Sequence, residues 1–124
     1  MKKTLGQIAM HVTHLDVMED FYKNTVGLTH LFTVPNRLSF FDLGGVRLML
    51  GIAEPGEYAL SRPILYYKTS RLDEEFARLK SVGVVVVHQP QLVAPMPDHD
   101  LWMAFFKDPE DNTFGIMEER SKNK

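Results

Sequence analysis

The feature that most constrains the fold is a short stretch of sequence that occurs twice. LDVMEDFYKNTVGL begins at residue 15 and LDEEFARLKSVGV at residue 72, and both have apolar residues at helical spacing and a closing Val-Gly. Each copy follows a strand-like segment, QIAMHV at 7–12 or ILYYKT at 64–69. A unit that is repeated only twice, roughly 55 residues apart, indicates an internal duplication, because a solenoid needs at least about three stacked repeats.

The ends of these two amphipathic helices have recognisable signals. Ser or Asp followed three residues later by an acidic residue is typical of a capping box, and glycine is typical of a helix stop. We therefore expect capping boxes formed by Asp16 with Glu19 and by Ser70 with Asp73, and helix stops at Gly27 and Gly83.

Three further strand candidates follow each helix. They are THLFTV, RLSFFDL and VRLMLGI in the first copy, with a hairpin turn at Gly44-Gly45, and VVVVHQ, LWMAFFKD and NTFGIME in the second. The pattern predicts an α+β fold of two βαβββ modules, 5–53 and 62–119, joined by a linker at 53–63 within a single domain of residues 1–124. We expect two curved mixed sheets with the helices outside and a cleft between their concave faces, where small molecules tend to bind.

Composition excludes several functional classes. Fourteen basic and sixteen acidic side chains nearly balance and are scattered, which argues against nucleic acid as a partner. The absence of cysteine excludes disulfides and thiolate metal sites. The longest apolar run, VGVVVV at 82–87, is too short to span a membrane, and Gln7 and His11 interrupt the first apolar run, so we expect no secretory signal and a cytoplasmic protein.

Several segments carry a family resemblance that extends over nearly the whole chain. The hairpin FDLGGVRLML at 41–50, the second helix and above all FFKDPEDN at 105–112 resemble the vicinal oxygen chelate superfamily. That superfamily includes glyoxalase I, extradiol dioxygenases, and bleomycin and fosfomycin resistance proteins. Asp111 stands where the family turn usually has glycine, and aspartate tolerates the left-handed conformation better than most residues.

The resemblance also implies where a metal would bind. Metal-dependent members take their ligands from the first and last strands of each module, which correspond here to Gln7, Met49, Ile64 and Gly115. Gln7 is an acceptable ligand, but a thioether is a poor one for zinc, nickel, manganese or iron, and isoleucine and glycine offer no donor. We therefore expect no cofactor, with a divalent metal at a relocated site as the alternative.

Strand alternation places other candidates on the predicted cleft face. If Gln7 faces the cleft, so does His11, and the same parity in the fourth strand turns Arg47 and Met49 inward. We name Gln7, His11, Arg47, Met49 and Trp102 as candidate substrate-binding residues. His11 is either an acid or base or a histidine satisfied within the sheet, and Arg47 either pairs with an anion or is solvated at the surface.

The segment HQPQLVAPMPDHDLW at 88–102 holds the remaining candidates. Its three prolines predict a stiff lid loop rather than a plain hairpin. His99 is the second candidate acid or base, but Asp98, His99 and Asp100 are adjacent and fit a polar loop tip better than a metal site. Trp102 either packs against a ligand ring or anchors the loop.

Three functional hypotheses follow. The first is a metal-free protein that binds a small, partly apolar molecule in the cleft between the modules. The second is a metal-dependent lyase or dioxygenase-like enzyme that uses His11 or His99 with a relocated metal site. The third is a structural or regulatory dimer without a ligand. Members of this fold commonly form homodimers, so we expect one here.

Overall fold

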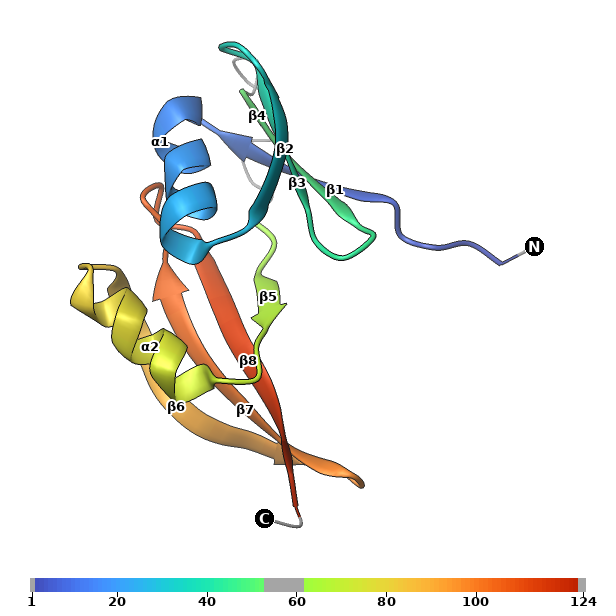
Figure 1. Ribbon diagram of the computed structural model, residues 1–124, viewed down its shortest axis with the longest axis vertical. Coiled ribbons are helices and arrows are strands. Elements are labelled where there is room, and N and C mark those ends of the chain that lie inside the picture. Colours follow the sequence, from blue (N-terminus) through green and yellow to red (C-terminus); the bar gives the residue numbers. More distant parts are fainter. Residues whose placement is uncertain (1, 53–61, 123–124) are drawn as a thin grey trace. The chain divides into compact units, whose positions relative to one another are not determined.

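The computed structural model describes residues 2–52 and 62–122, which fall into two compact units, Met1–Pro63 and Ile64–Lys124 (Figure 1). The first unit contains β1 (Gln7–Val12), α1 (Leu15–Asp20), the π-helix η1 (Phe21–Val26), β2 (Thr29–Val34), β3 (Leu38–Asp42) and β4 (Arg47–Ile52). The second contains β5 (Leu65–Lys68), α2 (Leu72–Ser81), β6 (Val85–Pro95), β7 (His99–Lys107) and β8 (Thr113–Ser121). The linker predicted at 53–63 lies mostly outside the described residues.

Each unit forms one mixed four-stranded sheet. Sheet A has the strand order β1-β4-β3-β2 and sheet B the order β5-β8-β7-β6. The first strand of each unit pairs in parallel with the last, and the other neighbours are antiparallel. The predicted α+β fold of two βαβββ modules is therefore confirmed, and the two sheets have the same topology.

One face of each sheet is covered by the helix of its own unit (Figure 1). Alternate residues of β4 and β7 point to that face, and Leu48, Leu50 and Phe106 are fully buried there. In unit 2 the ring centroid of Phe76 from α2 lies 5.8 Å from that of Phe106. Among residues 2–52 and 62–122, no helix of the same unit covers the opposite face of either sheet, and we call it the helix-free face.

The capping-box predictions were wrong at both helices. α1 begins after His14 and α2 after Arg71, and neither residue makes a side-chain capping hydrogen bond. A carboxylate from another strand replaces the second cap, since Glu118 of β8 accepts a hydrogen bond from the Leu72 amide at 3.0 Å. A cap of this kind depends on tertiary structure, so sequence spacing does not reveal it.

The glycine stops were predicted correctly. Gly27 and Gly83 adopt φ angles of 92° and 88° after the two helical segments. The first segment is not α-helical throughout, because its second half is the π-helix η1, at whose end the Gly27 amide donates a hydrogen bond to the Tyr22 carbonyl five residues earlier at 3.1 Å.

Both predicted turns are also present. Gly44 and Gly45 join β3 to β4 with φ angles of 75° and 102°. Asp111 stands in the left-handed region at φ 67°, and the carboxylate of Asp108 accepts hydrogen bonds from the Glu110 and Asn112 amides at 2.9 Å each.

The lid predicted from the prolines of residues 88–102 was wrong. β6 runs through Pro90 to Pro95 and pairs with β7 as a long hairpin with three register shifts. β6 is an edge strand of sheet B, where a proline without an amide proton interrupts the ladder on only one side. Among the described residues, no helix is long and apolar enough to cross a membrane.

Candidate functional site

The helix-free face of sheet A carries four of the five predicted substrate-binding residues, and three of them are in contact. Gln7 and Arg47 are neighbours in the parallel β1/β4 ladder, and Arg47 Nε donates a hydrogen bond to Gln7 Oε1 at 2.8 Å. The amide nitrogen of Gln7 lies 3.8 Å from the sulfur of Met49. The predicted parity of these strands is confirmed, since Leu48 and Leu50 are buried on the other face.

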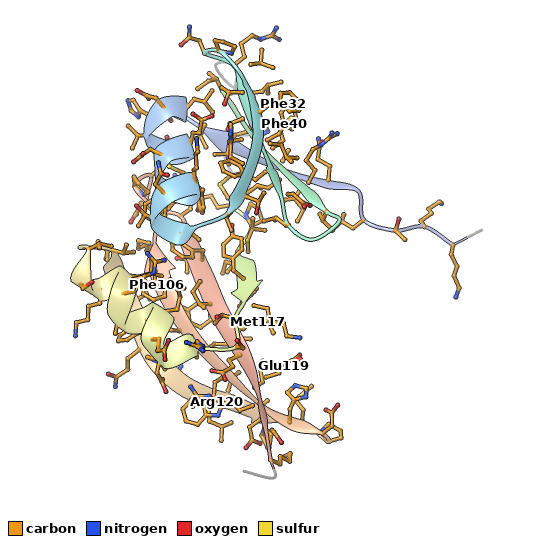
Figure 2. All side chains as sticks on the ribbon, viewed as in Figure 1. Phe32, Phe40, Phe106, Met117, Glu119 and Arg120 are labelled. Atoms are coloured by element: carbon orange, nitrogen blue, oxygen red, sulfur yellow. The ribbon has the colours of Figure 1, made fainter. Side chains whose placement is uncertain are left out.

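Two phenylalanines extend this cluster across the sheet. The guanidinium carbon of Arg47 lies 5.1 Å from the ring centroid of Phe40. Phe40 stacks on Phe32 with a centroid distance of 4.6 Å and an interplanar angle of 27° (Figure 2). Phe32 is 49% exposed whereas Phe40 is buried, so Phe32 is the ring that this stack offers to a ligand.

His11 lies on the same face, four residues further along β1. It is half-buried, and its partner in the ladder is Gly51 of β4. The structure therefore places His11 on the same strand as Gln7 but brings no acidic residue next to it in the ladder.

The helix-free face of sheet B carries an aromatic row. Tyr66, Gly115, Phe105 and His88 are successive partners across all four strands. The rings of Tyr66 and Phe105 meet edge to face at 5.9 Å, and those of His88 and Phe105 at 6.3 Å. Tyr66 is 46% exposed, which makes this row an apolar surface with an accessible phenol.

The aromatic row leaves no room for a side chain at residue 115. A Cβ atom at residue 115 would lie 2.8 Å from Tyr66 Cδ2 and 3.2 Å from Phe105 Cε1, closer than carbon atoms normally approach. The Tyr66 ring thus fills the space that a side chain at residue 115 would need. Sequence reasoning noted the missing donor at residue 115, but not the ring that takes its place.

The four positions at which the family would hold a metal do not fit one. Gln7 is bonded to Arg47, Met49 offers a thioether, Gly115 is covered by Tyr66, and Ile64 precedes β5 with an apolar side chain that is 46% exposed. Within residues 2–52 and 62–122, no three histidine, aspartate or glutamate side chains form a group suited to a metal ion.

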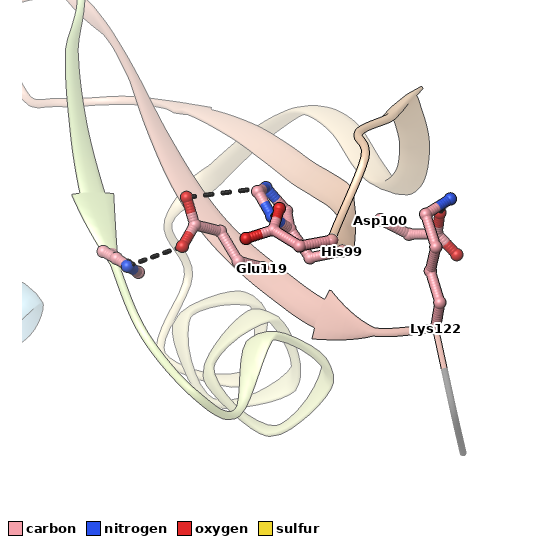
Figure 3. A network of polar contacts seen from close by, with 6 residues as sticks. His99, Asp100, Glu119 and Lys122 are labelled. Carbon is pink, nitrogen blue, oxygen red and sulfur yellow. Dashed lines mark hydrogen bonds and ion pairs between the residues drawn. The ribbon is translucent and has the colours of Figure 1, made fainter.

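His99 stands in a network of charged residues at the far end of sheet B. Its Nδ1 lies 2.7 Å from an Asp98 carboxylate oxygen and its Nε2 3.6 Å from Glu119, which also pairs with Lys68 at 2.7 Å (Figure 3). The hydrogen bond from His99 lowers the pKa of Asp98, and the hydrogen bond from Lys68 lowers the pKa of Glu119. This network orients an imidazole on the helix-free face, and its members Lys68 and Glu119 were not predicted from the sequence.

Trp102 lies on the other face of sheet B from His99. It is the ladder partner of Glu118, and its ring is covered by the guanidinium of Arg120 at 4.4 Å. Arg120 also pairs with Asp73 of α2 at 3.2 Å and with Glu118 at 3.1 Å. The structure therefore places Trp102 beside the start of α2 and separates it from the aromatic row.

A second polar cluster lies between α1 and sheet A. Glu19 accepts hydrogen bonds from Thr33 and, at 2.7 Å, from the buried Ser39, and it lies 3.1 Å from His30. Burial raises the pKa of Glu19, but these hydrogen bonds and the charge of His30 together lower it below the ordinary value. Thr33 and Glu19 also line a surface pocket of about 340 Å³ near the start of α1.

Comparisons with known proteins identify the family of the chain and proteins with a similar fold. The family model of the Glyoxalase/Bleomycin resistance protein/Dioxygenase superfamily matches residues 4–116. No curated protein gives a significant match. Among solved structures, a lactoylglutathione lyase from Agrobacterium tumefaciens is 19% identical with a TM-score of 0.74, and the match covers 95% of each chain.

Two further solved structures are similar over nearly their whole length. TnmS3, an antibiotic binding protein from Streptomyces sp. CB03234, is 25% identical with a TM-score of 0.75, covering 95% of this chain and 97% of its own. TioX from Micromonospora sp. ML1 is 20% identical with a TM-score of 0.72, covering 94% and 98%.

Proposed function

Because the chain belongs to the glyoxalase/bleomycin resistance protein/dioxygenase superfamily, we propose that it binds a small, partly apolar organic molecule without the divalent metal of the family's enzymes. The binding surfaces are the helix-free faces of its sheets. The face of sheet A offers the exposed Phe32, Arg47 and the thioether of Met49, and the face of sheet B offers the aromatic row. Each of them suits a ligand with a planar apolar part.

The contact between Tyr66 and Gly115 is the observation that carries this proposal. A metal ligand at residue 115 and the present Tyr66 ring would occupy the same space, since even a Cβ atom would lie 2.8 Å from the ring. Where a metal-dependent member of the family would have a hydrophilic metal ligand, this chain has an apolar surface. Such a surface favours organic rings over a hydrated cation. The similarity to TnmS3, which is described as an antibiotic binding protein, supports the same class of ligand.

The second candidate function is a metal-dependent lyase or dioxygenase-like enzyme with His11 or His99 as acid or base. The charged network favours His99 over His11, because Asp98 at 2.7 Å fixes the orientation of its imidazole. In this alternative a metal would bind outside the four family positions.

A homodimer and a cytoplasmic location are part of the proposal. β6 is a long edge strand with exposed Val85, Val87, Leu92 and Val93, and an unpaired edge of this kind favours association with another strand. Light scattering coupled to size-exclusion chromatography tests the dimer, and cell fractionation tests the location.

The metal content of untagged protein, purified without chelator, separates the two functions. We expect less than stoichiometric metal by mass spectrometry and no rise in melting temperature on adding zinc, nickel, manganese or iron, together with stabilisation by planar aromatic compounds in a thermal-shift screen. About one metal per chain, lost in His99→Ala or His11→Ala, would contradict the proposal and establish the enzyme alternative.

A further inference from the structure

The exposed side chain of Arg47 has two defined contacts on the helix-free face of sheet A. Its Nε is engaged by Gln7 at 2.8 Å, and its guanidinium lies 5.1 Å from the centroid of Phe40. Gln7 is itself positioned by Met49 through a contact of 3.8 Å. These contacts use the Nε side and one face of the guanidinium, and they leave the N–H groups at its outer edge to other partners.

Arg47 differs in this respect from three other arginines of the chain, and within the described part of the chain it shares the lack of a carboxylate partner with Arg37. Arg71, Arg78 and Arg120 each pair with a carboxylate within their own unit. Among residues 2–52 and 62–122, no aspartate or glutamate forms an ion pair with Arg47. Its cross-strand neighbour Asp42 instead accepts a hydrogen bond from the Gly45 amide at 3.1 Å.

An exposed ring stands on the same face as this cation. Phe32 stacks on Phe40 at 4.6 Å, and Arg47 lies over Phe40, so the arginine and the exposed Phe32 are joined through one buried ring (Figure 2). The guanidinium is a planar fork that binds carboxylate or phosphate with two parallel hydrogen bonds. The phenylalanine offers a flat apolar surface to a second ring.

We propose that Arg47 is the specificity-determining residue of this face and that the ligand is an aromatic acid, with its anionic group on Arg47 and its ring against Phe32. The inference rests on the proposed function and narrows it to one class of ligand. Gln7 acts as a positioning residue, because it directs the guanidinium without contacting the anion. Carboxylate and phosphate share the required geometry, so both belong to the test.

The test compares probes that share the naphthalene ring and differ in the charge and identity of the polar group. Binding of 1-naphthoate, methyl 1-naphthoate and 1-naphthyl phosphate is titrated by amide chemical shifts of the labelled protein. We expect the anionic probes to bind about 10- to 100-fold more tightly than the ester, which corresponds to about 1.4–2.7 kcal/mol, a magnitude typical of hydrogen bonds to a charged group. The anionic probe that binds more tightly shows whether this face prefers a carboxylate or a phosphate group.

Three variants assign the preference to Arg47. Arg47→Met should reduce the ratio of acid to ester affinity to about 1, because the acid loses more affinity than the ester, and Gln7→Leu should reduce the ratio in part. Arg37→Met, which removes a charge from the β2–β3 turn of the same unit, serves as the control and should keep the wild-type ratio.

The outcomes distinguish this inference from the function on which it rests. Equal binding of acid and ester, or an unchanged ratio in Arg47→Met, overturns the aromatic acid but retains an apolar binding protein. No binding of any probe overturns both. Loss of the ratio in Arg37→Met as strongly as in Arg47→Met shows a general effect of net charge and also overturns the assignment.

Discussion

The contact between Tyr66 and Gly115 predicts a strong dependence of stability on the side chain at residue 115. In Gly115→Ala the new Cβ atom would stand 2.8 Å from the Tyr66 ring and 3.2 Å from Phe105, whereas carbon atoms at rest are about 3.5–4.0 Å apart. Overpacking of this size costs about 1–3 kcal/mol. Alanine recovers about 0.5–1 kcal/mol of that cost, because glycine is unfavourable within a strand. From the midpoints of these two ranges, the net expectation is a loss of about 1 kcal/mol in the free energy of unfolding.

A double-mutant cycle shows whether the Tyr66 ring is responsible. Tyr66→Ala removes the ring, so adding Gly115→Ala in that background should be neutral or stabilising, with a coupling of about 1–2 kcal/mol between the two sites. Urea denaturation measures the four proteins, and the fluorescence of Trp102, the single tryptophan, reports directly on unit 2.

Gly6→Ala is the matched control, since a Cβ atom there meets nothing within 4 Å. It should change stability by a few tenths of a kcal/mol at most. The reasoning fails if Gly115→Ala is as stable as the wild type with Tyr66 present, or if the cycle shows no coupling. Either result would mean that the ring moves aside freely and does not block a side chain at residue 115.

Three further predictions concern groups outside the binding faces. The pKa of Glu19 is lowered on folding, so ionised Glu19 stabilises the fold above its ordinary pKa of 4.5, and this stabilisation is lost as the pH falls through the pKa of the folded state. Glu19→Gln should therefore weaken the pH dependence of acid unfolding, which circular dichroism measures. Burial, together with the charge of Asp108, raises the pKa of Tyr67. The protonated phenol therefore contributes its full stabilisation below about pH 10, and this contribution is lost at higher pH. Tyr67→Phe should unfold at a higher pH than the wild type in an alkaline titration. Glu118→Ala removes the acceptor for the Leu72 amide and should lower the free energy of unfolding by about 1 kcal/mol in urea, whereas Glu118→Gln, which keeps an acceptor oxygen, should lose less.

The fold was predictable because its signals are local. The two periodic stretches gave both helical segments, and Gly27, Gly83 and Gly44-Gly45 ended elements where the structure ends them. The turn at Asp111 followed from the same reasoning, since its left-handed backbone depends only on its own side chain and its immediate neighbours. Strand parity also separated the buried Leu48 and Leu50 from Arg47 and Met49.

The errors concern features that depend on distant partners. The N-terminal cap of α2 is Glu118, which is 46 residues away in sequence, so no capping box could indicate it. The prolines of β6 suggested a loop because the sequence does not reveal that this strand lies at the edge of its sheet, where proline is tolerated. Trp102 as a ligand-binding residue stays a prediction, and its parity in β7 and its contact with Arg120 place it on the helix side.

The two sheets show how a duplicated module acquires two different surfaces. The row Ala9-Met49-Phe40-Phe32 of sheet A occupies the same ladder positions as Tyr66-Gly115-Phe105-His88 of sheet B. In sheet A the small residue is on the first strand and the larger side chain on the last, and in sheet B that order is reversed. A ring on β5 therefore requires glycine on β8, while alanine on β1 leaves room for Met49 beside Gln7 and Arg47. In both sheets a small residue is paired with a large one, so each face stays well packed. The face of sheet A thereby carries an oriented cation, and the face of sheet B carries a row of rings.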